Sequence, residues 1–69
     1  SPEGATMPFL QVNILEGRTE EQKLGLIREL TETVCRVLGS KPEAVRVLIN
    51  DVPNTNWGIA GKSAKELGR

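Results

Sequence analysis

The fold is decided by residues 7–18, which read Met-Pro-Phe-Leu-Gln-Val-Asn-Ile-Leu-Glu-Gly-Arg. Within this stretch the apolar side chains of Leu10, Val12 and Ile14 alternate with polar ones, and a period of two predicts a half-buried strand over residues 9–15. The glycine at position 17 supplies a turn that ends the strand. A proline precedes the strand. It is either an ordinary strand opener or, at a free chain start, a secondary amine.

A helix is expected to follow this strand. Thr19-Glu20-Glu21-Gln22 has the capping-box pattern, in which the threonine hydroxyl and the glutamine side chain bond each other's backbone N–H groups. Apolar residues then recur at helical spacing, and Gly39 ends the helix as a glycine in the left-handed conformation commonly does. The apolar positions of this helix are Leu24, Ile27, Leu30, Val34, Val37 and Leu38.

Residues 45–50 alternate again and predict a second strand. Strand, helix and strand in one short chain form a β-α-β unit, whose strands lie parallel and whose crossover is right-handed. The helix is expected to cover one sheet face and to leave the other bare. Residues 57–61 form a short apolar piece bracketed by glycines, which predicts a hairpin or an arm toward a neighbouring subunit. The expected fold class is α+β.

The composition of the chain limits its function. With one cysteine and no histidine, the chain can form no internal disulfide and has no recognisable zinc site. A chain of 69 residues also buries too little of its own apolar surface to be comfortably stable. We therefore expect self-association to bury more of that surface. Zero net charge excludes the basic footprint of a nucleic-acid binder, and no apolar run is long enough to span a membrane. We expect a cytoplasmic protein. Residues 1–7 are interpreted as a leader or tag remnant and residues 8–69 as the domain.

Few residues of this chain are candidates for a catalytic or ligand-binding role. The usual general bases and phosphate-cradling glycine loops are missing, so no metal or cofactor is expected. The candidates that remain are Pro8, Arg18, Arg46 and Trp57. Residue type alone favours an ordinary structural role for each: a strand opener, two solvated charges and a core or interface aromatic residue.

The candidates lie within a recognisable set of segments. Residues 8–23 read Pro-Phe-Leu-Gln-Val-Asn-Ile-Leu-Glu-Gly-Arg-Thr-Glu-Glu-Gln-Lys, residues 45–49 read Val-Arg-Val-Leu-Ile, and residues 56–61 read Asn-Trp-Gly-Ile-Ala-Gly. From Pro8 to about Lys65 the chain resembles the 4-oxalocrotonate tautomerase family of the tautomerase superfamily. The Leu-Glu-Gly-Arg and Trp-Gly-Ile-Ala-Gly segments at their mutual spacing make the resemblance specific.

The resemblance implies β-α-β subunits that pair into a four-stranded sheet dimer and assemble as a hexamer, a trimer of dimers, either homomeric or heteromeric. It implies catalytic roles for Pro8, as an amino-terminal base, and for Arg18 and Arg46, which bind a small-molecule carboxylate. Leu15 and Trp57 are the implied apolar substrate contacts. The implied reaction is ketonisation of 2-hydroxymuconate-like enols in the catabolism of aromatic hydrocarbons, without a cofactor.

Two features of the sequence bear on that reading. Related dehalogenases and hydratases carry an arginine and a glutamate where this chain has Leu15 and Ile59, so the apolar residues here favour tautomerisation. If residues 1–7 stay attached, the Pro8 nitrogen is an amide without a basic lone pair. The alternatives are therefore an extended member with Pro8 blocked, a catalytically silent structural subunit of a hetero-oligomer, or a binding module that performs no chemistry.

Overall fold

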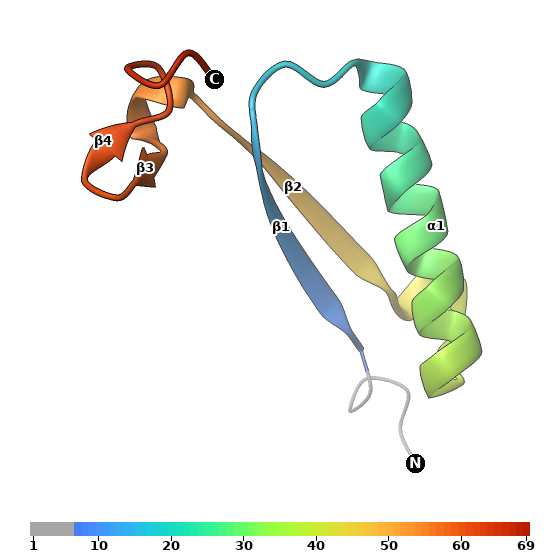
Figure 1. The fold of residues 1–69 in the computed structure, drawn as a ribbon. Helices are drawn as coiled ribbons and strands as arrows, with labels where there is room; N and C mark the ends of the chain where they lie inside the picture. Colours follow the sequence, from blue (N-terminus) through green and yellow to red (C-terminus); the bar gives the residue numbers. More distant parts are fainter. Residues whose placement is uncertain (1–6) are drawn as a thin grey trace.

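The computed structural model describes residues 7–69 and shows a β-α-β unit followed by a small hairpin (Figure 1). The elements are β1 (Phe9–Leu15), α1 (Glu20–Leu38), β2 (Arg46–Val52), β3 (Gly58–Ile59) and β4 (Lys62–Ser63). β1 and β2 pair in parallel, with α1 as their crossover. The predicted α+β class is confirmed. The leader expected over residues 1–7 lies, apart from Met7, outside the described residues.

The two long strands are in register along their whole length, from Phe9 opposite Arg46 to Leu15 opposite Val52. The bounds of β1 are those that its alternation predicts. β2 begins one residue later than expected and ends two residues later, because it pairs with β1 as far as β1 extends. Val45 lies just before β2, at the end of a 3-10 turn (Pro42–Ala44), and is only 8% exposed.

The predicted capping box begins α1. The Thr19 N–H donates to Gln22 Oε1 at 2.9 Å, and the Gln22 N–H donates to Thr19 Oγ1 at 3.1 Å. At the other end Gly39 adopts a left-handed conformation (φ +71°) and donates its N–H to the Cys35 carbonyl at 3.0 Å. Because the cap at each end satisfies backbone groups that a helix leaves unpaired, the local sequence alone fixes both ends of α1.

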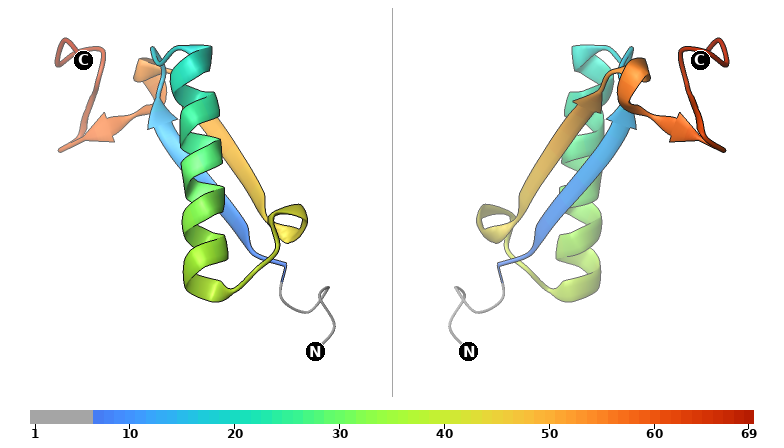
Figure 2. Two further views of the ribbon diagram at one scale, coloured as in Figure 1. Left: turned by 90° about the vertical axis from the view of Figure 1, so that its right-hand side faces the viewer. Right: turned by 90° about the vertical axis from the view of Figure 1, so that its left-hand side faces the viewer.

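α1 lies against one face of the β1–β2 sheet and leaves the opposite face bare, which the two side views show (Figure 2). The predicted apolar stripe of the helix is wider than this sheet covers: Leu30 and Val34 are half-buried, whereas Leu24, Val37 and Leu38 are 55%, 66% and 65% exposed. A sheet of two strands spaced about 4.8 Å apart is too narrow to cover the whole stripe.

The bare face of the sheet mixes apolar and polar side chains. Phe9 and Leu48 are 63% and 47% exposed on it. Two residues beyond Leu48, Asn50 Nδ2 donates to Asn13 Oδ1 at 3.0 Å across the two strands. A two-stranded sheet with one uncovered face is marginal by itself. The chain therefore presents apolar surface on both its helix layer and its sheet layer.

Residues 53–69, here called the C-terminal arm, follow β2. The arm begins with a 3-10 turn (Asn54–Asn56) and continues into the antiparallel hairpin of β3 and β4, whose turn includes Gly61 at φ +84°. Of the hairpin or arm expected for residues 57–61, the hairpin is present, with its strands over residues 58–63, and Figure 1 shows the C-terminal arm standing apart from α1. Ala64 is fully buried and serves as the arm's own small core. Within residues 7–69 no helix has the length and apolarity needed to cross a membrane.

Candidate active site

Two of the candidate site residues lie together at the beginning of the sheet. Pro8 directly precedes β1, and its carbonyl accepts the Arg46 backbone N–H at 3.0 Å, which extends the strand pairing by one bond. The Arg46 guanidinium turns back along its own chain, where Nη1 donates to the Glu43 carbonyl at 2.6 Å and to the Val45 carbonyl at 3.3 Å. The backbones of Pro8 and Arg46 are thus neighbours, while the guanidinium is held against the carbonyls that precede β2.

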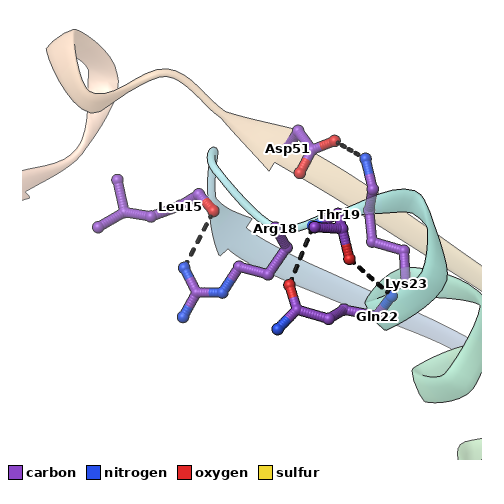
Figure 3. Close-up of polar contacts among 6 residues, drawn as sticks. All are labelled: Leu15, Arg18, Thr19, Gln22, Lys23 and Asp51. Atoms are coloured by element: carbon purple, nitrogen blue, oxygen red, sulfur yellow. Dashed lines mark hydrogen bonds and ion pairs between the residues drawn. The ribbon is translucent and has the colours of Figure 1, made fainter.

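Two other candidate residues, Leu15 and Arg18, lie at the far end of β1. Arg18 Nη1 donates to the carbonyl of Leu15, the last residue of β1, at 3.3 Å (Figure 3). Gly17 between them has φ +119°, a conformation that L side chains rarely adopt. Glycine here lets the chain fold Arg18 back over the strand end, immediately before the Thr19 cap of α1.

An ion pair stabilises this end of the sheet. Lys23 Nζ lies 2.7 Å from Asp51 Oδ2, so the first turn of α1 is tied to the end of β2 (Figure 3). The two side chains are 30% and 41% exposed, so solvent weakens the pair, and it contributes at most about 1 kcal/mol to stability. Its main effect is to hold the loop that carries Arg18 between two fixed points.

Trp57 lies on the C-terminal arm, at the start of β3. It is half-buried and lines an open hollow of about 380 Å³. The other residues around this hollow are Thr55, Asn56, Gly58, Gly61, Lys62 and Ser63. An indole face beside hydroxyl, amide and ammonium groups suits a small planar molecule that carries negative charge.

The candidate residues form two groups within one chain. Pro8 and Arg46 are at one end of the β1–β2 pair, and Leu15 and Arg18 are at the other. Seven strand residues at about 3.3 Å each separate the two ends by roughly 20 Å. One small substrate molecule cannot touch both groups of the same chain.

The structure also contains side-chain contacts that were not predicted. The Glu16 carboxylate accepts the Asn54 N–H at 3.0 Å, across 38 residues of sequence. On the arm, the backbone N–H and the hydroxyl of Ser63 donate to Glu66 Oε2, and these hydrogen bonds lower the pKa of the Glu66 carboxyl below its usual value. The Glu16 contact has no signal in residue type, whereas residues 63–66 read Ser-Ala-Lys-Glu, the capping-box pattern, with the Glu66 N–H donating to Ser63 Oγ at 3.1 Å.

Comparison with known proteins places this geometry in a family. The sequence model of the family described as "Tautomerase enzyme" matches residues 8–67 of the chain. The chain belongs to the 4-oxalocrotonate tautomerase family. It is therefore a tautomerase, an enzyme of the isomerase class, and the resemblance found in the sequence is confirmed. The match begins at Pro8.

The alignments with related proteins cover nearly the whole of this tautomerase. A "2-hydroxymuconate tautomerase" from Comamonas testosteroni is 56% identical over 63 residues, which are 91% of this chain and 100% of that protein. One from Pseudomonas putida is 51% identical over the same coverage. Among solved structures, a 4-oxalocrotonate tautomerase isozyme from Methylibium petroleiphilum has a TM-score of 0.86 at 53% identity, and covers 90% of this chain and 100% of that chain.

Proposed function

We propose that this tautomerase ketonises 2-hydroxydienoate-type enols such as 2-hydroxymuconate, with the amino group of Pro8 as the base. The observation that carries the proposal is the 56% identity, over its full length, of a relative named "2-hydroxymuconate tautomerase". The apolar residues Leu15 and Ile59 add support, because neither offers a group that activates water.

The proposed mechanism moves one proton. With the bond between Met7 and Pro8 cleaved, the Pro8 nitrogen accepts the proton of the enol hydroxyl and returns it to carbon at the far end of the dienolate. The product is an α,β-unsaturated ketone, and no atom is gained or lost. A free α-amino group has a pKa of about 7.7 to 8.0, so a neutral amine is available near pH 7, and a nearby guanidinium increases its share.

The two arginines hold and stabilise the substrate in this mechanism. A guanidinium binds a carboxylate with two parallel hydrogen bonds, and its charge stabilises the oxygen of the dienolate as negative charge develops there. Arg46, whose backbone N–H bonds the Pro8 carbonyl, stabilises the reacting oxygen, whereas Arg18 binds a distal carboxylate. Leu15 and Trp57 keep water out and strengthen both effects.

We propose further that the complete site forms between subunits of a hexamer built as a trimer of dimers. The separation of roughly 20 Å between the two groups within one chain supports this, since a second subunit must supply the missing group. The bare sheet face and the exposed helix residues support pairing of this kind. A solved relative described as a fused 4-OT is an asymmetric trimer, of which this chain covers 50%.

The test compares two forms of the same chain. A form beginning at Pro8 is expected to ketonise 2-hydroxymuconate, followed by loss of the dienol absorbance, at least about 100-fold faster than a form beginning at Ser1, because general base catalysis contributes about 10²–10⁴-fold. Pro8→Ala in the shorter form supplies an amine of different geometry as a control. Equal rates from the two forms, or no ketonisation by the form beginning at Pro8, refute the proposal.

A further inference from the structure

The C-terminal arm is joined to the β-α-β unit by the side chain of Glu16. This residue directly follows β1, and its backbone N–H donates to the Val52 carbonyl at 2.9 Å, so its main chain forms the last bond of the strand pair. Its carboxylate Oε2 accepts the Asn54 N–H at 3.0 Å. Glu16 is therefore fixed at its backbone by the sheet and reaches the arm with its side chain.

Asn54 is where the arm receives this contact. It is the first residue of the 3-10 turn Asn54–Asn56, whose preceding residue, Pro53, provides no side-chain cap. The N–H groups at the start of a helical turn need acceptors, and here Glu16 supplies one. Asn54 also accepts the Lys65 N–H on its carbonyl at 3.1 Å and donates its side-chain amide to the Arg69 carbonyl at 3.0 Å.

Trp57 lies three residues after Asn54 and is hydrogen-bonded within the same C-terminal arm. Its carbonyl accepts the N–H of the fully buried Ala64 at 2.7 Å, so the start of β3 and the end of the chain move together with the 3-10 turn. The direction of the arm relative to the sheet is set by the peptide link through Pro53 and by the bond from Glu16. A change in that direction displaces the indole of Trp57.

We propose that Glu16 is a positioning residue, whose carboxylate sets the orientation of the C-terminal arm and thereby places Trp57 against the substrate. The proposal rests on the proposed function, in which Trp57 is a wall of the site. Glu16 itself touches no reacting atom. Its loss is expected to weaken substrate binding through Trp57 and to leave the proton transfer at Pro8 nearly unchanged.

The fluorescence of Trp57 reports directly on the surroundings of this residue, because Trp57 is the single tryptophan of a chain that has no tyrosine. In the full chain, Glu16→Ala is expected to shift the tryptophan emission to the red and to increase its quenching by acrylamide about twofold, as the arm loosens. Glu16→Gln keeps a side-chain carbonyl as acceptor and restores the parent values. Lys23→Ala is the matched control: it breaks a bond at the same end of the sheet that does not reach the arm.

A second variant removes the donor instead of the acceptor. Asn54→Pro deletes the N–H at the first position of the 3-10 turn, where proline is well tolerated, and Pro53 already has the extended conformation (ψ 146°) that a following proline requires. Asn54→Ala keeps the N–H and loses only the side-chain bond to Arg69. Asn54→Pro is expected to reproduce the fluorescence of Glu16→Ala, whereas Asn54→Ala is not.

Kinetics separate positioning from a merely structural role. In the form of the enzyme that ketonises 2-hydroxymuconate, Glu16→Ala is expected to raise KM about fivefold to tenfold with kcat within about twofold, and to have no further effect when combined with Trp57→Ala. Unchanged fluorescence in Glu16→Ala, or an equal effect on KM with and without Trp57, overturns the proposal. If no form ketonises any enol, the proposed function fails, while the fluorescence still decides whether Glu16 positions Trp57.

Discussion

Replacement of Arg46 by alanine separates the contribution of this residue to the chemistry from its contribution to the fold. The guanidinium is exposed and, within residues 7–69, donates to two nearby carbonyls, those of Glu43 and Val45. Two such bonds near solvent contribute at most about 1.5 kcal/mol to stability. Because the backbone N–H that bonds Pro8 is retained in Arg46→Ala, the strand pairing remains and the variant is expected to fold.

The effect on the reaction is expected to be larger. Removal of a fixed cation beside a developing oxyanion reduces kcat by about 10²–10³, which corresponds to about 2.7–4 kcal/mol of transition-state stabilisation. The assay is the rate of loss of the dienol absorbance of 2-hydroxymuconate, measured as kcat and KM for the form beginning at Pro8. Arg28→Ala removes an equally exposed arginine from α1 and is the matched control, with rates expected to equal those of the parent.

One result refutes this reasoning. If Arg46→Ala keeps kcat within about threefold of the parent, the guanidinium does not stabilise the transition state. Arg46→Lys distinguishes charge from geometry, because an ammonium keeps the charge and loses the two-pronged donor pair. The lysine variant is expected to recover part of kcat and little of the affinity for the carboxylate.

Three further predictions concern the elements that carry the site. Thr19→Ala breaks the capping box and is expected to lower the free energy of unfolding by about 1 kcal/mol, measured by urea denaturation, whereas Thr19→Ser retains it. Gly17→Ala forces an L side chain to φ +119° and is expected to cost at least about 1 kcal/mol in the same assay, although no atom obstructs the added methyl group. The pKa of Glu66 is expected to lie below the usual value for a glutamate in an NMR titration. Because its folded pKa is lowered, the stability it contributes is present above its unfolded pKa and disappears as pH falls through the folded pKa, and Ser63→Ala moves the pKa back up.

The parts of the fold that local chemistry dictates were predictable. The alternation of residues 9–15 gave the bounds of β1, and the capping box with Gly39 gave both ends of α1. In each case the side chains that satisfy the backbone are close in sequence. β2 was predicted less well, since its end at Val52 is set by pairing with Leu15 and not by its own pattern.

The surroundings of the helix were not predictable from one chain. The apolar stripe of α1 predicts burial for Leu24, Val37 and Leu38, but the two-stranded sheet of this chain is too narrow to cover them. The positions of the candidate site residues relative to one another were not predictable either. The resemblance named Pro8, Arg18, Arg46, Leu15 and Trp57 together, and one chain holds them at two ends of its sheet.

The link between Glu16 and Asn54 has no signature in the sequence. A glutamate before a glycine is ordinary for a solvated turn, and its partner is a backbone N–H, which every residue but proline possesses. Only the path of the chain brings the two together. Contacts of this kind place the parts of a site relative to one another, while residue type indicates which parts do the chemistry.

The central claim is that the free amino group of Pro8 accepts the proton, and an NMR titration tests it most directly. In a form beginning at Pro8 and labelled with ¹⁵N-proline, the amine signal is distinct from the amide nitrogens of Pro42 and Pro53. The titration of this amine is expected to coincide with the pH at which kcat/KM for 2-hydroxymuconate rises, because the neutral amine is the active form. A rise in kcat/KM more than about one pH unit away from that titration contradicts the claim.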